Sequence, residues 1–469
     1  MTPVDVVAAE SLPHKGPPMT VYIFNMSEDV WSFIENMSDV KARDLEIAEN
    51  AALCERDLFT YAGEDNVLFI ASRPVSEQFY SYYVSLFGNK NFSLAVPDKH
   101  TGEICRDILE DKAVMDRIVE AANSSRKLTL AAYATSLQFL DFIEALREKG
   151  ISVYTPEAPE EEDAWTVNFF GSKSGIRQLS QQSGAIEPDF KMPSGVICVG
   201  VEDAARIAAK KFIKEKGVVI KTNKGHSGMG VDIYREGELP VDYRQCEKKL
   251  LGSFRKNAYW DKFPIIIEDY IAPNNAVGGG FPNVEFKILK SGKIEFLYYC
   301  GMRVTKDGVF QGVEINDDVI ADRIAVHMMD VGFFIGARYA STGYRGYYDV
   351  DFIAGKNGEL FVTESNVRRT GGTHVYKTAL CLFGKDFMHE TYILSNNVYA
   401  LPTGKARSFE KLTQVLAPIL YNKETKEGLI VASENLLFQD KLAYMIFGKS
   451  RKRALELEAE MENSLRAVS

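Results

Sequence analysis

Short apolar runs alternate with amphipathic stretches over the first third of the chain, and this alternation limits the folds open to it. The runs VYIF (21–24), VLFIAS (67–72), LTLAAY (128–133) and ISVYTP (151–156) have the length and composition of buried strands. Residues 107–125 and 139–150 carry apolar side chains at helical spacing. Strands that alternate with helices form a parallel sheet, so we predict an α/β domain over 19–170.

The pattern changes beyond residue 170, where longer strand runs are separated by glycine-rich turns. These runs are 218–221, 264–271, 284–289, 347–353 and 360–365. They predict an α+β region with mostly antiparallel strands, followed from Ser450 by a charged amphipathic surface helix. A chain of 469 residues exceeds the roughly 250–300 residues at which one hydrophobic core stops growing, so we expect several domains.

Composition and charge exclude several classes of protein. The net charge of −10 disfavours binding to nucleic acid, and no apolar run approaches the roughly 18 residues of a membrane-spanning helix. The six cysteines occur singly and the six histidines are scattered, so no zinc site is predicted. Residues 1–18 lack the features of a secretory signal and are predicted to form a flexible tail. We expect a cytoplasmic protein with reduced thiols and no nucleic-acid or membrane partner.

A glycine-rich loop follows a predicted strand in GVVIKTNKGHSGMGVDIYRE (217–236). The strand ends in Lys221, and Gly225, Gly228 and Gly230 follow it. Glycines let backbone N–H groups wrap an anion and the lysine adds a positive charge, which is the chemistry of phosphate binding. The P-loop, dinucleotide-binding and protein-kinase motifs are absent. A plain glycine-rich hairpin would have the same composition.

An apolar strand precedes an acidic and aromatic turn in PIIIEDYIAP (264–273). Such a strand can line an apolar slot for an adenine ring, whose edge needs one backbone N–H and one C=O. An ordinary buried strand would show the same pattern.

A predicted hairpin in YDVDFIAGKNGELFVTESNVRRTGGTH (348–374) carries oxygen ligands on one face. Glu364 and Asn366 are two residues apart and share a face of their strand, and the turn brings Asp351 beside them. Converging oxygen ligands suit Mg²⁺, which leaves positions for phosphate oxygens. Arg368 and Arg369 follow and are placed to hold negative charge near the metal. The alternative interpretation is a hairpin that carries polar residues on its solvent-exposed face and binds no metal.

The three stretches, taken in this order, resemble the ATP-grasp family, in which two α+β subdomains clamp ATP. The ending ESNVRRTGGTH is similar to a subgroup, the pheganomycin-type peptide ligases, in which a pre-ATP-grasp domain precedes the ligase. The resemblance implies a combined α/β and α+β fold class, with an N-terminal pre-ATP-grasp α/β domain followed by a two-subdomain ATP-grasp fold. The implied division is a tail (1–18), the pre-ATP-grasp domain (19–170), a small subdomain with the glycine-rich lid loop (171–272), a large subdomain with the metal site (273–400), and a C-terminal segment that packs on the ligase core (401–469).

The resemblance also implies roles for individual residues. ATP would be bound by Lys173 (or, as a second candidate, Arg177), Lys221, the loop residues Gly225, His226, Ser227, Gly228, Met229 and Gly230, the hinge residues Glu268, Asp269, Tyr270 and Ile271, and Glu285. The metal ligands would be Asp351, Glu364 and Asn366, and the catalytic residues Arg368, Arg369, Arg303 and Arg345.

The implied cofactors are ATP and Mg²⁺, with Mn²⁺ as a substitute. The implied reaction is ATP-dependent carboxylate–amine ligation through an acylphosphate, which releases ADP and phosphate and forms a peptide or amide bond. The substrates would be a carboxylate and an amine, such as an amino acid, a peptide or a carrier-bound acid, and the fold makes a homodimer an expectation. Two alternatives stay open: an ATP-grasp phosphotransferase without an amide product, and a non-catalytic nucleotide-binding regulatory protein.

Overall fold

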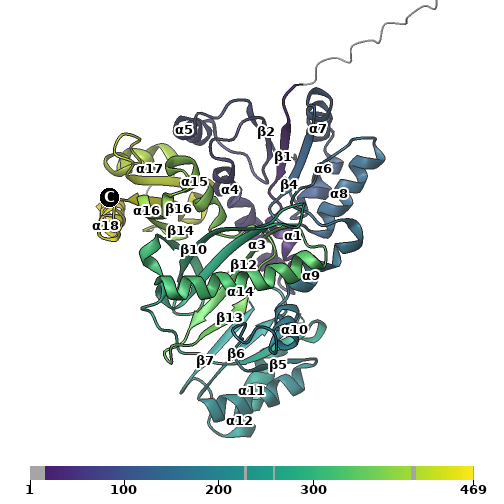
Figure 1. Cartoon of the computed structure of the whole chain (residues 1–469), viewed down its shortest axis with the longest axis vertical. Coiled ribbons are helices and arrows are strands. Elements are labelled where there is room, and N and C mark those ends of the chain that lie inside the picture. The colour runs from purple at the N-terminus through teal and green to yellow at the C-terminus, as the bar shows by residue number, and fades with distance from the viewer. Residues whose placement is uncertain (1–15, 226–229, 257–258, 403–407, 468–469) are drawn as a thin grey trace, which may run out of the picture.

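The computed structural model describes residues 16–225, 230–256, 259–402 and 408–467 (Figure 1). Three sheets, of four, eight and four strands, organise these residues. The eight-stranded sheet occupies the middle of the molecule, with the N-terminal sheet on one side and the third sheet at the opposite end (Figure 1). None of the helices in these ranges combines the length and the apolar character that crossing a bilayer requires.

The N-terminal sheet is entirely parallel, which confirms the predicted α/β architecture. In spatial order its strands are β3 (Phe92–Ala95), β2 (Val67–Ile70), β1 (Met19–Ile23) and β4 (Leu128–Ala132). The strand predicted at 151–156 is wrong, because Tyr154 forms only an isolated bridge with Thr129. Strand β3 has no counterpart among the predicted strands, since its four residues, FSLA, are too short and too mixed to stand out.

The predicted helix 107–125 is in fact two helices, α6 (Ile104–Glu110) and α7 (Lys112–Ser124), separated at Asp111. Asp111 is extended, and its carboxylate accepts a hydrogen bond from the Val114 N–H (3.0 Å), which caps α7. Apolar spacing continues through the break, so periodicity alone does not reveal it. The other helices of this region are α1 (Met26–Asp29), α2 (Trp31–Ile34), α3 (Val40–Ala52), α4 (Cys54–Leu58), α5 (Glu77–Phe87) and α8 (Leu137–Glu148).

The third sheet is antiparallel and carries the glycine-rich segment. In spatial order its strands are β5 (Gly195–Cys198), β8 (Ile265–Asp269), β6 (Gly217–Thr222) and β7 (Val231–Arg235). Helices α11 (Val201–Glu215) and α12 (Tyr243–Phe254) pack against it and against each other, and α13 (Tyr259–Lys262) precedes β8. The buried face of α11 is mostly alanine, which lets the helix approach the sheet closely.

The eight-stranded sheet is antiparallel throughout. In spatial order its strands are β13 (Leu360–Glu364), β12 (Gly346–Ala354), β9 (Pro282–Ile288), β10 (Ile294–Val304), β11 (Phe310–Ile315), β14 (Tyr392–Ala400), β16 (Lys441–Gly448) and β15 (Gly428–Ser433). Helix α14 (Asp322–Ser341) lies along one face. Glycines make this contact close: an added Cβ would lie 2.2 Å from the Phe286 ring at Gly332 and 2.0 Å from the Tyr348 hydroxyl at Gly336.

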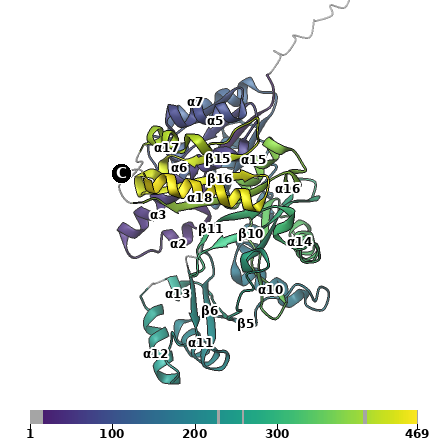
Figure 2. The same cartoon turned by 90° about the vertical axis from the view of Figure 1, so that its left-hand side faces the viewer.

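The C-terminal segment from residue 401 is part of this same sheet, to which it contributes β15 and β16. Its last helix, α18 (Arg451–Ala467), buries Ala454, Leu457, Met461 and Leu465 against these strands (Figure 2). The remaining helices around the sheet are α9 (Trp165–Phe170), α10 (Lys173–Ser183), α15 (Thr373–Phe383), α16 (Phe387–Glu390) and α17 (Phe409–Leu416).

The sequence suggests a solvated linker at the acidic segment 156–165; Glu160, Glu161 and Glu162 are indeed exposed, but Glu157 ties the segment to the eight-stranded sheet. Glu157 accepts from Lys287 (2.6 Å) and from Arg369 (2.5 Å). Burial raises the pKa of Glu157, but the charges of Arg369 and Lys287 outweigh it and hold the pKa at about 2. Lys287 and Arg369 are distant from Glu157 in the sequence, so the run of acidic residues gives no sign of these ion pairs.

Candidate functional site

A cavity of about 990 Å³ lies between the third sheet and the eight-stranded sheet and is bordered by helices α1, α3 and α4 of the N-terminal domain. Of the residues that the sequence predicts to be functional, the cavity is lined by Lys173, Lys221, Gly225, Glu268, Asp269, Tyr270, Ile271, Asp351, Glu364, Asn366 and Arg368. The structure therefore gathers the three separate motifs around one space. His226, Ser227, Gly228 and Met229 lie outside the described residues.

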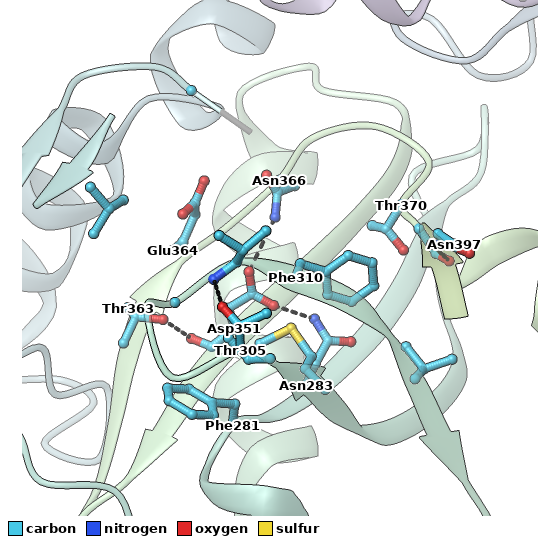
Figure 3. Close-up of a pocket in the computed structure, with 18 of the residues that line it drawn as sticks. Phe281, Asn283, Thr305, Phe310, Asp351, Thr363, Glu364, Asn366, Thr370 and Asn397 are labelled. Carbon is cyan, nitrogen blue, oxygen red and sulfur yellow. Dashed lines mark hydrogen bonds between the residues drawn. The ribbon is translucent and has the colours of Figure 1, made fainter. Parts of the chain in front are cut away.

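Strands β12 and β13 place the predicted metal ligands together. Asp351 on β12 is directly opposite Glu364 on β13, so both side chains leave the same face of the sheet. Asn366 follows β13, and its Nδ2 donates to Oδ2 of Asp351 (3.3 Å). Figure 3 shows Asp351 between Asn366 and Asn283. The predicted hairpin therefore forms, and it brings the three predicted ligands together.

Two further polar residues complete this cluster, and sequence reasoning missed both. Asp349, two residues before Asp351, accepts from the backbone N–H (2.8 Å) and the Nδ2 (3.0 Å) of Asn366. Asn283 on β9 donates from Nδ2 to Oδ1 of Asp351 (2.6 Å). The alternation in YDVDF carries a signal for Asp349, because residues two apart share a face. Asn283 has no local signal, since only the pairing of β9 with β12 brings it there.

The cluster has more negative charge than its neighbours neutralise. Burial raises the pKa of Asp351 well above its usual range, and the carboxylates of Asp349 and Glu364 raise it further. Burial, with a contribution from Glu285, raises the pKa of Asp349 to about 7 despite the hydrogen bonds from Asn366. Carboxylates held this close, with neutral amides around them, favour a cation in their midst.

The donor set fits Mg²⁺ better than a metal enclosed by protein alone. Among the described residues, no three His, Cys, Asp or Glu side chains are arranged to hold a metal by themselves. Asp351 and Glu364 supply carboxylate oxygens, and Asn366 supplies an amide oxygen. Mg²⁺ typically takes one or two carboxylates and completes its shell with water and phosphate oxygens. The site is therefore suited to a metal that arrives with a phosphate ligand.

Charged residues on the third sheet form a buried triad beside the cluster. Glu268 on β8 accepts from Lys221 Nζ (2.7 Å) on β6 and from Arg177 Nη2 (2.5 Å) on α10. Burial opposes the ionisation of Glu268, but the charges of Lys221 and Arg177 prevail and lower its pKa. Lys221 also donates to the Thr363 carbonyl (3.1 Å), which joins this sheet to β13. The predicted lysine and the predicted hinge strand are thus in direct contact.

The neighbouring predicted nucleotide residues surround the triad. Lys173, in the first turn of α10, donates to Oε1 of Glu364 (3.0 Å). Asp269 is paired with Lys211, while Tyr270 and Ile271 line the cavity wall. Gly230 closes the glycine loop with φ +75°, and a Cβ there would lie 2.1 Å from the Thr222 hydroxyl oxygen. That position therefore requires glycine.

Arg368 is the predicted catalytic arginine that reaches the cavity. Its Nε donates to Asp29 Oδ2 (2.7 Å) in the N-terminal domain, and its Nη2 donates to Asn366 Oδ1 (3.1 Å). It therefore links the N-terminal domain to the acidic cluster. Arg369 points away and is held by Glu157 and the Ala132 carbonyl.

Three other predicted residues do not line the cavity. Arg303 forms two hydrogen bonds with Glu458 of α18 (2.6 and 3.1 Å). Arg345 donates to backbone carbonyls at the end of α14 and in the β9–β10 turn. Glu285 is fully buried, and its carboxylate accepts from the hydroxyls of Tyr298, Thr370 and Thr373, each at 2.7 Å. Each of these side chains is fully engaged elsewhere in the fold.

Comparisons with known proteins give the fold of the whole chain. No protein-family model and no curated protein sequence matches it. A biotin carboxylase from Campylobacter jejuni in complex with β-γ-ATP matches with a TM-score of 0.56 and 13% identity, over 96% of this chain and 91% of that one. An N5-carboxyaminoimidazole synthase from Aspergillus clavatus, in complex with ADP and 5-aminoimidazole ribonucleotide, matches with a TM-score of 0.52 and 8% identity, over 96% of this chain and 99% of that one.

A third similar structure is the N5-carboxyaminoimidazole ribonucleotide synthetase from Thermus thermophilus, with a TM-score of 0.52 and 10% identity, over 96% and 99% of the two chains. At such identities the likeness shows the fold and nothing finer. The predicted fold class is confirmed: the chain has an N-terminal α/β domain followed by an ATP-grasp fold.

Proposed function

We propose that this chain is an ATP-dependent carboxylate–amine ligase that works through an acylphosphate and forms a peptide or amide bond. One observation carries the proposal: Asp351, Glu364 and Asn366 line a single cavity together with Lys173 and Lys221. Oxygen ligands for a metal and ammonium groups for phosphate are the two requirements of phosphoryl transfer. Structures of similar fold hold ADP, MgADP or an ATP analogue, which supports a nucleotide as the ligand here.

The nucleotide would lie between the third sheet and the eight-stranded sheet. Tyr270 and Ile271, just beyond β8, would offer an apolar wall and backbone groups to the adenine. Lys221 and Lys173 would turn from their acidic partners toward the phosphates, assisted by the backbone of the glycine loop that begins at Gly225. Mg²⁺ held by Asp351, Glu364 and Asn366 would neutralise the β- and γ-phosphate oxygens.

The carboxylate substrate would attack the γ-phosphorus, so that ADP leaves and an acylphosphate forms. The amine would then attack the carbonyl carbon, forming the C–N bond. The bond from that carbon to the phosphate oxygen breaks, and the amine proton leaves to phosphate or solvent. Arg368 is placed to stabilise the oxyanion of this step because Asp29 fixes its guanidinium beside the metal ligands.

The finer assignment, a peptide or amino acid ligase, rests on the similarity of ESNVRRTGGTH to the pheganomycin-type ligases. Arg368 and Arg369 in this stretch both contact the N-terminal domain, through Asp29 and through the Ala132 carbonyl and the Glu157 carboxylate. These contacts support the proposal, because the motif joins the N-terminal domain to the residues that would hold the metal, and a second substrate would be bound where the two meet.

The test is product analysis with Mg·ATP and pooled amino acids. We expect ADP and phosphate in equal amounts, together with a new condensation mass. ADP with a phosphorylated product and no new C–N bond would replace the ligase with a phosphotransferase. ATP binding without ADP formation from any acid and amine in the pool would favour the regulatory alternative.

A further inference from the structure

At the end of the cavity away from Glu364, the buried guanidinium of Arg56 forms no ion pair with a described residue, although burial raises the pKa of the adjacent Asp57 and the charge of Arg56 opposes that rise. Arg56 on α4 is 2% exposed, and it lines the cavity. Its Nε and Nη2 have no hydrogen-bond partner among the described residues. Two other cations of the cavity wall are paired: Lys441 with Glu49 (2.9 Å) and Arg368 with Asp29 (2.7 Å). An ionised group is costly to bury alone, so this guanidinium is suited to an incoming anion.

The side chains around Arg56 do not supply that anion. Asp57, the next residue, is engaged by the hydroxyls of Tyr22 and Thr60, and no ion pair links it to Arg56 within the described part of the chain. His374 is neutral, because burial and the charge of Arg56 both lower its pKa. The guanidinium thus has two nitrogens without a partner in a residue that belongs to the cavity wall.

Two amides at the same end present unmet acceptors. The Asn397 Nδ2 on β14 donates to the Gly371 carbonyl (3.0 Å), so the amide oxygen is left without a donor. Gln439, in the short helix Asn435–Gln439, lines the cavity with neither amide atom bonded in the described structure. In Figure 3, Asn397 and Thr370 lie across Phe310 from Glu364. The ligand for this end must therefore carry an anion and also N–H donors.

We propose that this end of the cavity binds an α-amino acid, free or at the end of a short peptide. Its carboxylate would bind the planar guanidinium of Arg56, and its N–H groups would donate to the amide oxygens of Asn397 and Gln439. A phosphate dianion also suits a guanidinium, but it has no N–H for the two amide oxygens. Leu53, Leu436 and Val398 line the same end and leave an apolar wall for the amino acid side chain.

This inference rests on the proposed ligase for the fate of the amino acid, which would be the amine substrate. Its binding can nevertheless be measured without turnover. Equilibrium dialysis and thermal melting of the full chain would use free amino acids, tested singly, each beside its carboxamide, with inorganic phosphate as a further probe. We expect at least one amino acid to bind, and its carboxamide to bind at least about tenfold more weakly because it lacks the charge.

The matched variants are Arg56→Met and Arg73→Met. Arg56→Met should lose at least about tenfold in amino acid affinity and keep its affinity for ATP, and Arg56→Lys should lose less. Arg73 lies over the Phe438 ring outside this cavity, so its replacement should leave amino acid binding unchanged. Arg56→Met should melt no lower than the wild type, because it removes an unpaired buried charge; a structural role for Arg56 would lower the melting temperature instead.

Binding of phosphate without any amino acid, equal binding of acid and carboxamide, or wild-type affinity in Arg56→Met would each overturn the site. If Arg56→Met does not fold, the comparison of acid with carboxamide on the wild type decides alone. A chain that binds amino acids through Arg56 but forms no ADP would refute the ligase and leave this site standing. If the chain forms ADP with amines that lack a carboxylate, the amino acid site is refuted and the ligase stands.

Discussion

The two ends of the cavity differ in how their charges are satisfied. At the end that we propose binds the nucleotide (the nucleotide end), Lys221, Lys173 and Arg368 each contact an acidic side chain of the protein. At the opposite end Arg56, Asn397 and Gln439 keep polar atoms without partners in the described structure. Binding at the first end must exchange internal ion pairs for contacts with phosphate and metal. Binding at the second end adds contacts where none exist, so that end is already organised for its ligand.

The largest effect should come from the metal ligands at the nucleotide end. We expect Glu364→Ala to reduce ADP formation at least about 100-fold, because a carboxylate that holds the metal is lost. The fold should largely survive, since Glu364 ends an edge strand of the sheet. ADP release is the measurement, and Glu359→Ala is the control, because Glu359 lies in the turn that joins the same two strands and pairs with Lys191 at the surface. Undiminished turnover in Glu364→Ala would remove the metal assignment.

The buried triad is the next largest test. Glu268→Gln should lower the free energy of unfolding by about 3 kcal/mol, because it leaves Lys221 and Arg177 buried without a counter-charge. Denaturant unfolding measures this loss. Adding Lys221→Met should recover part of it by removing one of the stranded charges. If Glu268→Gln is as stable as the wild type, Glu268 does not neutralise the charges of Lys221 and Arg177. The two ends of the cavity would then not differ in how their charges are paired.

The pH dependence of stability tests the end of the cavity that contains Arg56. Glu55 precedes Arg56 and accepts from Ser433 Oγ (2.9 Å) and from the N–H groups of Glu434 and Asn435 (2.6 Å each). It thereby ties α4 to the segment that carries Gln439. Burial raises the pKa of Glu55 from 4.5 to about 7.

The stability that Glu55 contributes is full below its ordinary pKa and is lost as the pH rises through 7, because the folded state holds the proton more tightly. Glu55→Gln keeps the accepting oxygen without that titration. We expect the variant to gain about 1–3 kcal/mol relative to the wild type between pH 5 and pH 8 in denaturant unfolding. A difference that does not change with pH would show that Glu55 stays ionised in the folded protein.

The smallest effect is expected for arginines that are engaged outside the cavity. Arg303→Gln and Arg345→Gln should change ADP formation by less than about threefold, since neither side chain lines the cavity. Arg303→Gln should still lower the melting temperature, because Glu458 loses its ion pair. Loss of activity with an unchanged melting temperature in either variant would place that arginine in the site after all.

The sequence predicts the nucleotide end better than the other end, and the reason is locality. Asp351, Glu364 and Asn366 belong to one hairpin, where the two-residue period of a strand determines which side chains converge. Arg56, Asn397 and Gln439 come from three separate elements, and each is ordinary in its own segment. Only the pairing of β14 with β16 and the packing of α4 against β15 bring them together. For the same reason the sequence suggests Arg303 and Arg345 as candidate catalytic residues but does not show where their side chains point.

The most direct test of the account follows oxygen from the carboxylate to phosphate. The chain would be given Mg·ATP and amino acids labelled with ¹⁸O in the carboxyl group, and the released phosphate would be analysed by mass spectrometry. An acylphosphate route leaves one carboxyl oxygen on the phosphate, so we predict one ¹⁸O per phosphate alongside the new amide. Unlabelled phosphate, released with or without a condensation product, would contradict activation of the carboxylate by this protein.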